Sequence, residues 1–223
     1  MDISQILRAV YESGSLLIAF GIGVYAFSKM NIFFRLAFFQ LTFWLTCYSL
    51  SYLVTQYQRQ NGLQLNNQWL MNLHLIGETL LLLAAAFIQI REKPVRVVVG
   101  LSAVAFLVII GIQWITTGFA QYFNMADVAA CLIMTMFFSY ILYKAIVDRK
   151  KDKRNNAVIL TCIGMLIYFG CSVPLMALLN VIHENDPEAS NFLFISISDV
   201  AANLRYLFLA GAFLTVSRTN YSL

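Results

Sequence analysis

Residues 80–88 read Leu-Leu-Leu-Leu-Ala-Ala-Ala-Phe-Ile, a run that is apolar on every side of any regular structure. A strand of a membrane barrel would alternate apolar and polar residues over about ten positions. Only helices and closed barrels satisfy their backbone hydrogen bonds inside a bilayer. Because the run does not alternate, it predicts a membrane-spanning helix and excludes a barrel.

Six other stretches have the same character. A hydrocarbon core about 30 Å thick needs a helix of roughly 20 residues, and the connections between these stretches are short. Hydrophobic residues make up 60% of the chain and charged residues only 12%, which excludes an ordinary soluble domain. We therefore expect an all-α integral membrane bundle, one domain over residues 1–223. Its spans are predicted at about 6–28, 33–57, 67–90, 95–117, 124–147, 156–182 and 192–217.

The positive charges are distributed unevenly between the two ends of these helices. Lysine and arginine lie mainly in the bends after the first, third and fifth helices and in the C-terminal tail, whereas the other side carries Arg8 and Arg59. Positively charged loops stay in the cytoplasm, which predicts an outer N-terminus and a cytoplasmic C-terminus. The expected location is a bacterial inner (cell) membrane. The basic run from Lys144 to Arg154 is interpreted as a topology determinant, with binding of anionic membrane lipid as the alternative.

Ionisable side chains at bilayer depth inside the predicted helices are candidates for function. At bilayer depth each costs at least roughly 2.5–3.5 kcal/mol unless it faces the bundle interior and finds a partner. Glu78 and Arg205 lie near the middle of the third and seventh helices, and Glu12 and Asp199 lie in the outer thirds of the first and seventh. These four residues are candidates for a ligand or ion site.

Glu78 and Arg205 reach similar depth because their helices run in the same direction, so we expect an ion pair if the helices are neighbours. Such a pair is either a structural clasp or part of a site. His74 lies four residues before Glu78, on the same face and nearer the outside. With Asn72 and Thr79 it could continue a polar path inward from the outer surface.

The seventh helix carries polar residues on two neighbouring faces. Ser196, Asp199 and Asn203 share one face, and Ser198 and Arg205 share the next. A helix of this kind is expected to be central in its bundle and not exposed to lipid. Asn203 therefore joins the site candidates, although interhelical hydrogen bonding without any ligand explains the same pattern.

Aromatic side chains are abundant, with eighteen Phe, eleven Tyr and three Trp. The deeper ones are Phe20, Tyr25, Phe43, Trp44, Tyr48 and Tyr168. A pocket for a hydrophobic ligand could be built from these rings, and ordinary packing is the alternative.

No catalytic motif and no metal-ligand spacing is visible. The four cysteines lie inside predicted helices without the spacing of a metal or redox motif. A haem-binding bundle usually needs two histidines at matching depth, but of the two histidines present one, His183, lies in a loop. We expect no enzymatic activity, no metal site and no nucleic-acid partner.

The seventh helix contains Asp199-Val200-Ala201-Ala202-Asn203. Together with seven helices, short loops and this chain length, it resembles the microbial rhodopsins, which carry an Asp-Val-x-Ala-Lys pattern there. The resemblance implies a retinal site in which the lysine forms a Schiff base and the aspartate is part of its counterion. Because asparagine at position 203 cannot form that linkage, no covalent retinal is expected. The family's Trp-x-x-Tyr-Pro motif also reads Gly-Cys-Ser-Val-Pro at residues 170–174. The seven-helix input modules of bacterial sensor kinases look similar at this level.

These features favour a non-enzymatic, seven-helix membrane receptor or sensor-like protein that binds a small hydrophobic ligand or a partner membrane protein. The alternative is a proton or small-ion channel or carrier that uses Glu12, Glu78, Asp199 and Arg205. A channel is expected to form a homo-oligomer, whereas a sensor is expected to engage a partner through its basic cytoplasmic face.

Overall fold

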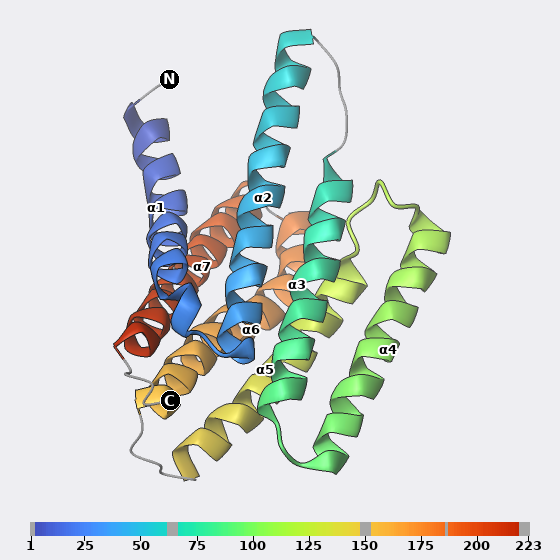
Figure 1. Ribbon diagram of the computed structural model, residues 1–223. Coiled ribbons are helices and arrows are strands. Elements are labelled where there is room, and N and C mark those ends of the chain that lie inside the picture. The colour runs from blue at the N-terminus through green and yellow to red at the C-terminus, as the bar shows by residue number, and fades with distance from the viewer. Residues whose placement is uncertain (1–2, 62–66, 148–152, 186, 219–223) are drawn as a thin grey trace. The chain divides into compact units, whose positions relative to one another are not determined.

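The protein is built from helices that follow one another along the chain (Figure 1). The computed structural model describes the backbone of residues 3–61, 67–147, 153–185 and 187–218, and the side chains of these except 3–13, 59, 153–154, 176–185 and 187–195. Within these ranges every regular element is helical. The elements are α1 (Ile3–Ala26), the short 3-10 helix η1 (Phe27–Lys29), α2 (Ile32–Asn61), α3 (Gln68–Gln89), α4 (Lys93–Thr117), α5 (Asn124–Val147), α6 (Lys153–Asn185) and α7 (Pro187–Ser217).

Seven α-helices confirm the predicted all-helical architecture and its helix count. Six of them, α2 to α7, are long and apolar enough to cross a membrane, which makes the chain a multi-pass membrane protein. The portion of α1 with described side chains, together with η1, forms an apolar segment over Gly14–Lys29 that is shorter than such a span. The predicted first span therefore stays a prediction.

The last two helices extend beyond the apolar stretches that predicted them. α6 covers Lys153–Asn185 against an expected 156–182, and α7 begins at Pro187 instead of 192. Helical hydrogen bonds are internal to the helix, so the backbone can continue through polar residues past the apolar region. Proline is favoured at the first helical position, where its missing N–H is not needed.

The chain divides into two compact units. The first comprises residues 1–34 and 131–223, which hold α1, η1, most of α5, α6 and α7. The second comprises residues 35–130, which hold most of α2, α3, α4 and the start of α5. The single seven-helix domain expected from the sequence stays a prediction.

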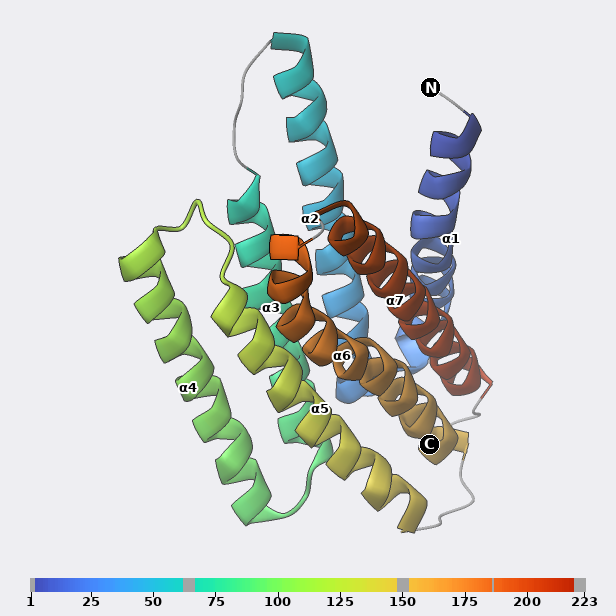
Figure 2. The same ribbon diagram turned by 180° about the vertical axis from the view of Figure 1, so that it is seen from behind.

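In the first unit α6 and α7 pack side by side, and α1 packs along α7 (Figure 2). The two helices lie close together at Gly164, where an added Cβ would come within 2.8 Å of the Phe208 Cβ and 3.1 Å of the Arg205 carbonyl oxygen. Glycine therefore sets the spacing of these two helices.

In the second unit α3 and α4 form an antiparallel pair joined by a tight connection. The Arg96 Nε donates to the carbonyl oxygens of Phe87 (3.0 Å) and Ile90 (2.8 Å) at the end of α3. α4 is the least buried of the six spanning helices, and it exposes large aliphatic side chains such as Leu101 and Ile115. Such a surface fits lipid contact.

Candidate functional site

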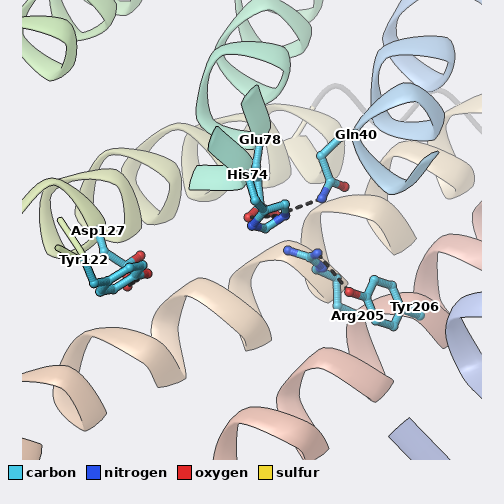
Figure 3. Close-up of polar contacts among 7 residues, drawn as sticks. All are labelled: Gln40, His74, Glu78, Tyr122, Asp127, Arg205 and Tyr206. Carbon is cyan, nitrogen blue, oxygen red and sulfur yellow. Dashed lines mark hydrogen bonds and ion pairs between the residues drawn. The ribbon is translucent and has the colours of Figure 1, made fainter. Parts of the chain in front are cut away.

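Glu78 lies near the middle of α3 and is only 5% exposed. Its Oε1 accepts a hydrogen bond of 2.8 Å from the Nε2 of Gln40 on α2, and its Oε2 lies 3.4 Å from the Nε2 of His74 (Figure 3). A carboxylate at membrane depth is tolerable only with such polar partners. The spacing of four residues predicted that His74 and Glu78 share a helix face, and their 3.4 Å approach confirms this.

Aromatic rings of α2 cover the His74 imidazole. Phe43 stacks on it with ring centres 6.4 Å apart, and Trp44 lies at 5.3 Å in a tilted arrangement. Tyr48 continues the wall by packing on Trp44 at 4.9 Å. An added Cβ at Gly77 would overlap the Phe43 ring, so the glycine lets this ring lie against α3. We call Gln40, Phe43, Trp44, His74 and Glu78 the Glu78 cluster.

Sequence reasoning missed Gln40, which is fully buried. The signal was present, because a glutamine stands inside the predicted span 33–57 between Phe39 and Leu41. An amide inside a bilayer also needs a partner, and the Glu78 carboxylate supplies it.

Asn72, expected to contribute to a polar path, instead bonds to the backbone of the connection between α4 and α5. It is fully buried, and its Nδ2 donates to the carbonyl oxygens of Phe119 (2.9 Å) and Gln121 (2.7 Å). Its Oδ1 accepts a hydrogen bond of 3.0 Å from the backbone N–H of Phe123. One side chain thus fixes the connection between α4 and α5 onto α3.

Arg205 is fully buried on α7 in the first unit. Its guanidinium lies 4.1 Å from the centre of the Tyr168 ring of α6 and 5.1 Å from that of Tyr206, and its Nη2 donates to the Tyr206 hydroxyl at 3.4 Å (Figure 3). Ring faces attract a cation most strongly where water is excluded. We call Tyr168, Arg205 and Tyr206 the Arg205 cluster.

The expected polar face of α7 is also engaged with neighbours. Asn203 is 8% exposed, accepts a hydrogen bond from the Ser15 hydroxyl of α1, and donates through Nδ2 to the Asp199 carbonyl oxygen at 2.8 Å. Asp199 itself is half-buried. α7 is the most buried of the six spanning helices, as its two polar faces predicted. The Glu12 side chain lies outside the described residues.

The structure therefore brings together the side chains of His74 and Glu78, whereas Asn203 bonds to the backbone carbonyl of Asp199. Glu78 and Arg205 belong to different units, so their ion pair stays a prediction. A double-mutant cycle of thermal stability with Glu78→Gln and Arg205→Met tests it, because additive effects would mean that the two residues do not interact.

No group of three or more His, Cys, Asp or Glu side chains is placed to hold a metal ion within the part of the chain whose side chains are described. No family model, curated protein or solved structure matches the chain.

Proposed function

We propose that this chain is a non-enzymatic membrane receptor or sensor-like protein that binds a small hydrophobic ligand or a partner membrane protein. Its N-terminus lies outside and its C-terminus in the cytoplasm of a bacterial cell. Two kinds of observation support the proposal. α4 exposes a large apolar surface that suits lipid contact, and buried polar side chains of the spanning helices hydrogen-bond to one another in the Glu78 and Arg205 clusters.

Asn72 is the observation that favours a sensor over a conducting protein. A path from the Gln68 end of α3 to Glu78 would use Asn72 and His74, which come before Glu78 on that helix. All the hydrogen-bonding capacity that Asn72 uses goes to backbone groups of residues 119–123. The Asn72 side chain, which would begin a polar path, is instead used to hold the α4–α5 connection against α3.

The competing function is a proton or small-ion channel or carrier. It is favoured by His74 and Glu78, two titratable groups 3.4 Å apart on adjacent turns of a spanning helix. In this alternative Glu78 would exchange ions or protons during transport, and Glu78→Gln would abolish transport without unfolding the protein.

Flux measurements distinguish the two functions. Protein reconstituted in liposomes with an internal pH dye should dissipate an imposed proton gradient no faster than empty liposomes, and the same should hold for a sodium gradient. Flux above that background that disappears in Glu78→Gln, but persists in the matched variant Asp127→Asn, would overturn the sensor proposal. Asp127 is a suitable control because its carboxylate accepts a hydrogen bond from the Tyr122 hydroxyl at 2.8 Å, as Figure 3 also shows.

Native mass spectrometry tests the binding function directly. Protein released gently from its membrane should carry an additional mass, either a small molecule or a second protein, that is lost on stringent delipidation. A specific ligand stabilises the folded state in proportion to the logarithm of its concentration over its Kd, so returning it should raise the Tm. Recovery of membrane phospholipid alone, with no effect on Tm, would contradict the proposal.

A further inference from the structure

The surroundings of His74 favour a positively charged imidazole, although an unperturbed histidine is mostly neutral at pH 7. Its Nε2 lies 3.4 Å from the Glu78 carboxylate, and two rings of α2 lie beside the imidazole, Phe43 stacked on it and Trp44 tilted against it. A carboxylate and aromatic faces both stabilise an imidazolium over a neutral imidazole. Its side chain is 12% exposed and lies about 9 Å along the axis from the Gln68 end of α3.

Within the second unit, titratable groups near the imidazole lie on α3 and α2. On α3 the neighbour is Glu78, whose second oxygen is held by Gln40. On α2 the rings that contact His74, Phe43 and Trp44, are uncharged. One turn further along α2 lie two titratable residues, the buried Cys47 and Tyr48, and the Tyr48 ring packs on Trp44. Glu78 is thus the carboxylate placed to respond when His74 changes charge.

The geometry points to His74 as a proton-binding site, which makes the proton a ligand of this protein. In the uptake step a proton from water adds to the lone pair of the His74 imidazole, and no bond within the protein breaks. The pair changes from a neutral ring beside a carboxylate to an imidazolium–carboxylate ion pair. Because the same carboxylate accepts the Gln40 hydrogen bond, proton binding is coupled to a contact between α3 and α2.

This inference specifies one ligand of the Glu78 cluster and does not depend on the receptor proposal. Protonation is read at His74 itself, whereas the receptor proposal is tested by flux and by bound mass. Either can fail while the other holds.

Histidine NMR provides the direct test without changing the cluster. The chain contains two histidines, so His183→Gln leaves His74 as the only source of an imidazole signal. With ¹³C-labelled histidine in detergent micelles, the His74 resonance should shift sigmoidally and reversibly as the pH falls from 8 to 5. A resonance that keeps the shift of a neutral ring over that range, or that of a charged ring, would overturn the proposal.

Trp44 supplies a second, independent signal. With Trp69→Phe and Trp114→Phe, Trp44 is the only tryptophan left. Its fluorescence should decrease with the same midpoint as the NMR titration, because an imidazolium quenches an adjacent indole more strongly than a neutral imidazole. His74→Gln should remove the pH-dependent change. A change that persists in His74→Gln would assign it to another group and contradict the proposal.

Glu78→Gln tests the role of the carboxylate. Without its counter-charge the imidazolium is less favourable, so the midpoint of both signals should move to more acidic pH. Asp127→Asn removes a carboxylate from the same unit but outside the cluster, and it should leave the midpoint unchanged. Equal effects of the two variants would show that Glu78 has no specific contact with the charged ring.

Discussion

At the scale of single residues, spacing predicted contacts within one helix but not contacts between helices. The pairing of His74 with Glu78 follows from a separation of four residues, which places side chains on one helix face whatever the rest of the fold. The bond from Gln40 to Glu78 depends on which helices are neighbours and on their register. The hydrophobic periodicity of one sequence encodes neither of these, so Gln40 could not be predicted as a partner of Glu78.

The hydrogen bonds of Asn72 give a residue-scale prediction. Asn72→Leu leaves two carbonyl groups and one N–H of residues 119–123 without this partner, so it should lower the free energy of unfolding by about 1–3 kcal/mol or more. Asn61→Leu is the matched control, since its exposed amide bonds only to the Tyr57 carbonyl of its own helix. Denaturant unfolding in detergent, followed by circular dichroism, measures both. Similar losses would show that the connection does not depend on Asn72.

At the scale of helices, two basic residues that contributed to the topology prediction also bind helix termini. Arg96 holds carbonyl groups at the end of α3, and the Lys29 Nζ donates to the Ser217 carbonyl oxygen at the end of α7 at 2.6 Å. A helix C-terminus carries unsatisfied carbonyl groups and a partial negative charge, which a cation satisfies. The sequence predicted the side of the membrane for these residues, whereas their partners required the structure.

Replacement of Arg96 separates these two roles. Arg96→Gln removes the guanidinium from the Phe87 and Ile90 carbonyl groups and should reduce stability by about 1–3 kcal/mol. Arg91→Gln removes the same charge from the same connection at an exposed position, so it controls for any effect on topology. Thermal unfolding in detergent should show a clearly lower Tm only for Arg96→Gln. A matching decrease in both variants would mean that net charge, and not the cap, is responsible.

Helix packing in the first unit gives a second prediction at this scale. Gly164→Ala places a methyl group against the Arg205 backbone and the Phe208 Cβ, neither of which can rotate away, and should cost about 1–3 kcal/mol. Gly170→Ala lies on the same helix, but there an added Cβ meets nothing within 4 Å, so it should be neutral or slightly stabilising. Comparison of the two Tm values isolates packing from helix propensity. Equal Tm values would mean that α6 and α7 are not in close contact at Gly164.

At the scale of the whole molecule, hydropathy predicted the number of helices and most of their bounds. Its success has a simple cause: apolar length is the property that selects a membrane-spanning helix. Hydropathy gave α5 as 124–147, its bounds in the structure, but placed the start of α7 five residues late because Pro187 and the residues after it are helical without being apolar. The sequence also shows at which position of which predicted span each polar side chain lies. It does not show which of these helices pack against one another.

The orientation of the chain and the role of α1 lead to the last prediction. Five predicted spans separate the 58–66 connection from the C-terminus, so these two positions should lie on opposite sides of the membrane. The N-terminus should lie on the same side as 58–66 if α1 spans, and on the opposite side if it does not. Epitope tags at the N-terminus, within 62–66 and after Leu223, read with a membrane-impermeant label on intact cells, should find the first two accessible and the third protected. An accessible C-terminus would reverse the orientation, and a protected N-terminus with an accessible 62–66 tag would reduce the number of spans to six.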